Sequence, residues 1–85
     1  MIVEFFGIPR HRAGCAMAQI DGETLADVLA ALTRSYPRLL GLQRPDGSPS
    51  PQYLVSLDGS RFLTDPQERL EPESRLLLLS ADAGG

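Results

Sequence analysis

His11 and Cys15, four residues apart, are the side chains of this sequence best suited to metal binding or nucleophilic catalysis. A protein zinc site needs three or four ligands, and the nearest carboxylates stand at no spacing typical of such a site. A Cys–His catalytic pair also needs a group that orients the imidazole, and none is recognisable. We therefore expect no metal site, with His11 in a solvated loop and Cys15 half-buried, as free cysteines often are.

The C-terminus is the second place where chemistry could occur. The chain ends with Gly84-Gly85, and the side chains of residues 80–83 before it are all small, apart from that of Asp82. Because glycine has no Cβ, such a tail can pass in extended form through a narrow channel of another protein. Its reactive atom would be the α-carboxyl carbon of Gly85, which becomes a good electrophile when activated, for example as an acyl-adenylate. A frayed terminus without function explains the same residues equally well from composition alone.

Size and charge exclude several classes of function. With 85 residues the chain can build one small core, so we expect a part of a larger system and not a self-sufficient enzyme. All eight basic residues are Arg, which excludes a Schiff-base lysine and a phosphate-loop lysine. The net charge of −3 argues against nucleic acid and anionic membrane as partners, and favours a basic partner surface.

The cysteine count and the N-terminal sequence bear on location. A single Cys cannot form an internal disulfide, and Met1 runs directly into an apolar segment with no basic region before it. We therefore expect a cytoplasmic protein.

The pattern of apolar residues predicts five strands and one main helix. The expected strands, rich in β-branched, aromatic or leucine residues, are 2–6, 15–20, 53–57, a short segment 61–63, and 75–79. The last contains four consecutive leucines, which is typical of a central strand covered on both faces. A polar turn is expected at 10–14, a loop at 41–51 and a capped helical turn at 65–68.

The main helix has clear start and stop signals. Thr24 and Asp27 form a capping arrangement, and Pro37 disfavours helical geometry at the residue before it. Between them a single apolar stripe recurs with helical spacing and can pack on a sheet; it consists of Leu25, Val28, Leu29 and Leu32.

Together these elements predict an α+β fold. The first and last strands both look central, so they should be parallel neighbours joined through the helix-containing segment. With one strong helix covering one face of a small mixed sheet, the β-grasp (ubiquitin-like) fold is favoured over a ferredoxin-like split fold. We expect a domain over residues 1–80 and a flexible tail over 81–85.

Several short motifs occur in an order that resembles the MoaD/ThiS family of sulfur carriers. They are Phe5-Phe6-Gly7, an Arg-containing loop that closes at Gly14, Thr24-Leu25 at the helix start, Tyr36-Pro37-x-Leu39 at its exit, the Asp58-Gly59 turn, and a leucine-rich strand that leads to Gly84-Gly85. This family includes the small subunit of molybdopterin synthase and the thiamine-pathway sulfur carrier. The resemblance spans nearly the whole chain and also implies the β-grasp fold.

The resemblance implies a carrier function. A ubiquitin-activating-type enzyme would adenylate Gly85 with MgATP, and a persulfide donor would convert it to a thiocarboxylate. A synthase would then accept the sulfur for molybdopterin, thiamine, cysteine or a similar product. Gly85 would carry first the adenylate and then the sulfur. Gly84, which has no side chain, would lie next to it in the active site of the partner. No cofactor would be bound tightly.

The resemblance also implies how partners bind. They would dock on the exposed sheet face and the tail, with Phe62, Leu63, Asp82, Ala83 and Gly84 as candidate contacts. Two other functions remain open: a ubiquitin-like modifier conjugated to other proteins through Gly85, and an interaction module whose tail is incidental.

Overall fold

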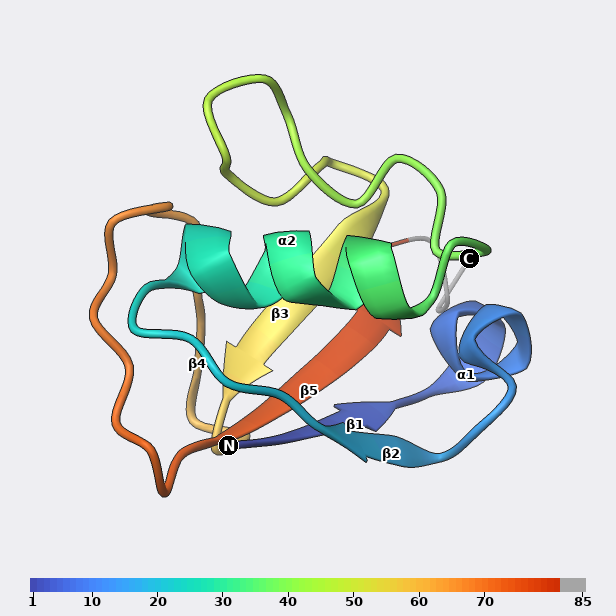
Figure 1. The fold of residues 1–85 in the computed structure, drawn as a ribbon, viewed down its shortest axis with the longest axis horizontal. Helices are drawn as coiled ribbons and strands as arrows, with labels where there is room; N and C mark the ends of the chain where they lie inside the picture. The colour runs from blue at the N-terminus through green and yellow to red at the C-terminus, as the bar shows by residue number, and fades with distance from the viewer. Residues whose placement is uncertain (82–85) are drawn as a thin grey trace.

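The structure, a computed structural model, describes residues 1–81. One five-stranded sheet is crossed on one face by a long helix (Figure 1). In chain order the elements are β1 (Ile2–Phe5), α1 (Gly7–Ala13), β2 (Met17–Gln19), α2 (Leu25–Ser35), β3 (Tyr53–Leu57), β4 (Arg61–Phe62) and β5 (Arg75–Ser80).

The strand order is β2-β1-β5-β3-β4, so the first and last strands of the chain are neighbours near the middle of the sheet. They run parallel, whereas every other pair is antiparallel. This is the β-grasp arrangement predicted from the sequence.

Helix α2 begins and ends where the sequence predicts. The Thr24 hydroxyl accepts a hydrogen bond from the Asp27 N–H at 3.2 Å, and the Asp27 carboxylate accepts one from the Thr24 N–H at 3.3 Å. This reciprocal pair satisfies two amide groups that the first helical turn leaves without partners. The predicted apolar stripe of α2 is fully buried against the sheet.

The last strand is covered less evenly than predicted. In β5, Leu76 and Leu78 point toward α2 and are buried, while Leu77 and Leu79 alternate with them and are half-buried. The run of four leucines therefore reflects one core face and one partly open face. The prediction that both faces are covered is wrong for the face opposite α2.

The predicted polar turn at 10–14 is instead the last part of a short helix, α1. Pro9 is its third residue, a position in the first turn where the missing N–H costs no helical hydrogen bond. Gly14 ends the helix with a left-handed φ of 79°, and its N–H donates to the Arg10 carbonyl. With seven residues, α1 is too short to show a helical period in the sequence.

The predicted helical turn at 65–68 is a turn that no helix follows. The Asp65 side chain accepts a hydrogen bond from the Gln67 N–H at 2.9 Å. The chain then pairs with the segment before α2, because Arg69 forms a bridge with Thr24 and the Leu70 N–H donates to the Glu23 carbonyl. These long-range hydrogen bonds replace those that a helix would have made.

Candidate functional site

The sheet face opposite α2, called here the outer face, is the first candidate surface. Residues paired directly across strands point to the same side of a sheet. The register therefore aligns Met17, Glu4, Leu77, Ser56 and Phe62 in one row across all five strands. The row runs from the edge of β2 to the edge of β4.

The outer face carries a group of apolar side chains beside the polar ones of Glu4 and Ser56. Phe62 and Met17, at the two ends of the row, are 59% and 52% exposed. Leu54 and Leu79 pair in the next row and are half-buried, as is Leu77. Apolar side chains exposed on one face of a protein are candidates for contact with another protein. These five apolar residues are called the outer-face patch below.

Phe62 and Leu63 are adjacent in the chain but have opposite environments. The Leu63 N–H donates to the Val55 carbonyl at 2.8 Å, and its side chain is 2% exposed in the core. Phe62 points the other way and lies on the outer face. The prediction that Leu63 contacts a partner is therefore corrected: Leu63 is a core residue, and Phe62 alone of the two offers a contact surface.

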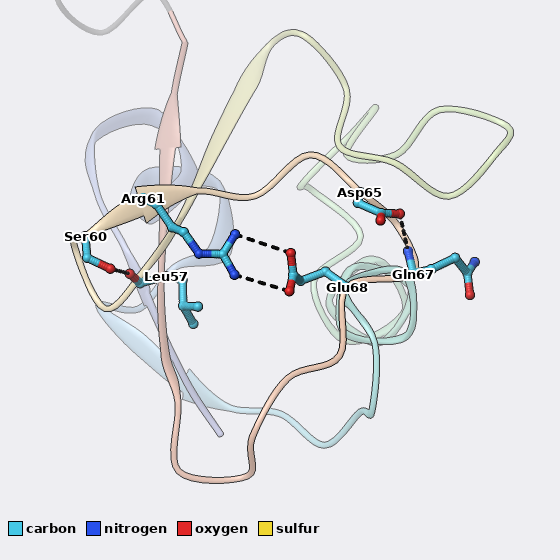
Figure 2. A network of polar contacts seen from close by, with 6 residues as sticks. All are labelled: Leu57, Ser60, Arg61, Asp65, Gln67 and Glu68. Atoms are coloured by element: carbon cyan, nitrogen blue, oxygen red, sulfur yellow. Dashed lines mark hydrogen bonds and ion pairs between the residues drawn. The ribbon is translucent and has the colours of Figure 1, made fainter.

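An ion pair holds β4 against the segment that follows it. The Arg61 guanidinium contacts both carboxylate oxygens of Glu68, at 3.3 and 3.2 Å, and Figure 2 shows the two groups facing each other. Because Arg61 is largely exposed, the pair contributes at most about 1 kcal/mol to stability. Its geometric effect is to tie down the strand that presents Phe62.

The second candidate region is the end of β5, where the C-terminal residues begin. The Ala81 N–H donates to the Gln52 carbonyl at 2.9 Å, so the first residue of the predicted tail is bound to the domain. A pocket of about 450 Å³ lies here, lined by Ile8, Arg12, Pro51, Gln52, Tyr53, Ser80 and Ala81. The predicted site residues Asp82, Ala83, Gly84 and Gly85 lie outside the described residues, and their roles stay predictions.

A short hydrogen-bond relay forms one wall of this pocket. The Arg12 guanidinium donates to the Tyr53 hydroxyl at 3.0 Å, and that hydroxyl donates to the Leu40 carbonyl at 2.8 Å. The relay joins α1, β3 and the segment after α2. Sequence reasoning missed it, because the three residues are far apart in the chain and carry no shared motif.

His11 and Cys15 line one open pocket of about 480 Å³, but within residues 1–81 no third metal-ligating side chain joins them. His11 is exposed on α1, whereas Cys15 is half-buried against the core. A side-chain hydrogen bond with Cys15, and secondarily burial, raises the pKa of the Tyr36 phenol. Tyr36 also makes an edge-on ring contact with Phe5, with centroids 5.5 Å apart. These contacts give Cys15 a packing role.

Within residues 1–81, no three His, Cys, Asp or Glu side chains are grouped so that they could hold a metal ion. Neither helix in that range has the length and apolar character needed to cross a bilayer.

Comparisons with protein-family models and with curated protein sequences found no match. Solved structures do match. Small archaeal modifier protein 1 (SAMP1) from Methanosarcina acetivorans superimposes with a TM-score of 0.80 at 23% identity, over 99% of this chain and 94% of that one. SAMP1 from Haloferax volcanii gives 0.77 at 24% identity, over 100% and 98%.

A third similar structure is a chain of the Amycolatopsis orientalis BexX/CysO complex, with a TM-score of 0.79 at 15% identity, over 99% of this chain and 98% of that one. At these identities the similarity establishes the fold. Because the coverage is nearly complete in both directions, the whole chain corresponds to one ubiquitin-like domain. These neighbours share the β-grasp fold that the sequence predicts for this chain.

Proposed function

We propose that this protein is a sulfur carrier of the MoaD/ThiS type, in which a partner enzyme adenylates the carboxyl group of Gly85 and a sulfur donor converts it to a thiocarboxylate. The observation that carries the proposal is the path of the chain. Central strand β5 ends at Ser80, the Ala81 N–H is bound to the domain, and the sequence continues as Asp82-Ala83-Gly84-Gly85.

The chemistry needs only the main-chain carboxylate of this chain. A carboxylate oxygen of Gly85 attacks the α-phosphorus of ATP, and pyrophosphate leaves. The terminal sulfur of the donor persulfide then attacks the acyl carbon, and AMP leaves with the electron pair of the C–O bond. A second thiol reduces the resulting acyl disulfide and releases the thiocarboxylate. MgATP and both sulfur reagents belong to the partners, and a synthase for molybdopterin, thiamine, cysteine or a similar product would accept the sulfur.

The central test is mass spectrometry of the intact chain. The protein is incubated with an adenylating enzyme encoded in the same genome, MgATP and a persulfide donor. We expect its mass to rise by the difference between sulfur and oxygen, with ATP and the donor both required and the change confined to the C-terminal peptide. If every adenylating enzyme of that genome leaves the mass unchanged, the proposal fails.

A second candidate function is supported by the names of two structural neighbours, which are modifier proteins. Conjugation would begin with the same adenylate but end in an isopeptide bond between Gly85 and a lysine of another protein. Because this chain has no Lys, its own side chains could not be acceptors. Proteolysis of cell extracts would then yield peptides whose lysines carry the C-terminal residues of this chain. A protein that acts only as a sulfur carrier would yield no such peptides.

The outer-face patch leads to a prediction about partner binding. We expect Phe62→Ala to raise the KM for this protein in the adenylation reaction about tenfold, since exposed aromatic residues often contribute 1–2 kcal/mol or more to an interface. The melting temperature should change little, because the ring is mostly in solvent. Leu63→Ala is the matched contrast and should lower the melting temperature clearly. If both variants were destabilised equally, Phe62 would have a core role and no partner role.

A further inference from the structure

The arginines of the described residues fall into two groups. Three of them pair with glutamates: Arg61 with Glu68 at 3.2 Å, Arg69 with Glu23 at 4.0 Å, and Arg75 with Glu4. A fourth, Arg44, lies near Asp46 in its own loop. The remaining four, Arg10, Arg12, Arg34 and Arg38, are exposed and, within residues 1–81, form no ion pair.

The sequence explains why these four have no carboxylate nearby in the chain. No Asp or Glu occurs between Glu4 and Asp21, or between Asp27 and Asp46. The four arginines lie in these two acid-free stretches and are called the tail-end arginines below.

The fold brings both stretches to the same end of the molecule. Arg10 and Arg12 lie on α1, and Figure 1 shows α1 at the same end of the molecule as the C-terminal end of α2, the end toward which β1 and β5 run. The two stretches are linked through β3, because the Arg12 guanidinium donates to the Tyr53 hydroxyl, which donates to the carbonyl of Leu40, two residues beyond Arg38. Arg12 also lines the pocket that contains Ala81, so the chain leaves the domain beside this arginine, whereas Arg10 lines a second pocket on α1 with His11 and Cys15.

Helix dipoles reduce this positive charge only in part. Arg10 and Arg12 lie in the last turn of α1 and Arg34 in that of α2, where a helix end carries about half a negative charge. Two such ends offset about one of the four guanidinium charges. Asp82 and the terminal carboxylate follow Ala81 in the sequence and offset about two more, so a positive excess of about one charge remains at this end although the chain as a whole carries −3.

Because salt screens charges over short distances, the charge near a binding surface affects a partner more than the net charge of the chain does. The molecule measures 29 Å along its longest axis, while charges in physiological salt are screened over about 8 Å. A partner that receives the tail therefore meets Arg12 and the other charges at this end, and charges at the far end of the molecule are screened from it.

We infer that the tail-end arginines form a docking surface for an acidic protein surface, located around the channel that receives the C-terminal residues. The inference rests on the proposed function, and it replaces the basic partner surface expected from the net charge. Guanidinium groups bind carboxylates through two parallel hydrogen bonds, so aspartates and glutamates at the channel entrance fit this surface.

Charge reversal tests the inference in the adenylation reaction. We expect Arg10→Glu/Arg38→Glu to raise the KM for this protein at least about tenfold near 0.05 M salt, with kcat unchanged and a smaller difference near 0.5 M. The control Arg44→Glu/Arg69→Glu has the same net charge but alters other regions, and its KM should change less than about twofold. Equal KM changes in the two double variants would overturn the inference. A wild-type protein that is never adenylated would instead contradict the proposed function.

A binding experiment gives an answer that does not depend on adenylation. The ¹⁵N-labelled chain is titrated with a glutamate-rich peptide, a DNA duplex of equal charge, and vesicles containing phosphatidylserine. We expect the peptide to shift amide resonances of residues 7–14 and 34–41, and to leave those around Arg69 unchanged. Peptide shifts elsewhere, or none, would overturn the inference, as would preferential binding of the DNA or the vesicles at these arginines.

Discussion

Deletion of Gly85 is expected to lower the rate of thiocarboxylate formation at least about 100-fold, because the remaining terminal carboxylate, that of Gly84, stops one residue short of the reactive position. One extended residue spans about 3.5 Å. A misplacement of only about 1 Å between reacting groups can already cost a factor of about 100. The domain itself should fold normally, since the last residue bound to it in the described chain is Ala81.

The measurement is the ATP-dependent mass increase over time, with the melting temperature as a check on folding. Gly85→Ala is the matched variant, because it keeps the chain length and adds one methyl group. We expect an intermediate loss from it, since a Cβ narrows the fit in a channel that accepts glycine. If the shortened chain gained sulfur as fast as the wild type, the reactive group would lie elsewhere and the carrier function would be refuted.

Leu29→Ala should cause the largest loss of stability of the substitutions considered for this protein. Leu29 lies in the middle of α2, is 1% exposed and faces the sheet. Truncation of a buried leucine costs about 2–5 kcal/mol through lost apolar contacts and a residual cavity. A small domain has only about 5–15 kcal/mol of stability in total, so the melting temperature should fall by about 10 °C or more.

Leu40→Ala is the control with the same chemical change. Leu40 is 68% exposed, so its truncation should change the free energy of unfolding by less than about 0.5 kcal/mol. Both values can be measured by urea unfolding monitored by circular dichroism. Similar losses in the two variants would mean that α2 does not pack on the sheet as described.

The local signals of the sequence were sufficient for the fold. The Thr24–Asp27 capping box and the apolar stripe of α2 depend on residues within two or three turns of each other, so they are visible in one sequence. The apolar first and last strands indicated a central parallel pair, and the sheet confirms it. The Gly84-Gly85 ending indicated where activation chemistry would occur, and that remains a prediction.

Long-range contacts decided the rest. Residues 65–68 carry the signals of a helix start, yet the Leu70–Glu23 hydrogen bond and the Arg69–Thr24 bridge that follow compete with the helix. In the same way, the sequence of a strand as short as β4 does not show which of two adjacent residues faces outward. The pairing of Ser56 with Phe62 places Phe62 on the outer face and leaves Leu63 for the core.

The distribution of charge shows most clearly what the sequence determines and what the tertiary structure decides. The sequence by itself determined the net charge of −3 and two stretches without acidic residues, because both are properties of composition and order. Only the hydrogen bonds that join Arg12 of α1, Tyr53 of β3 and the Leu40 carbonyl brought the two stretches to one end of the molecule and placed Arg12 at the exit of the chain. In physiological salt, electrostatic attraction acts over about 8 Å in space. It depends on distance in the folded structure and not on separation along the chain. The charge that a partner meets is therefore a property of the folded surface.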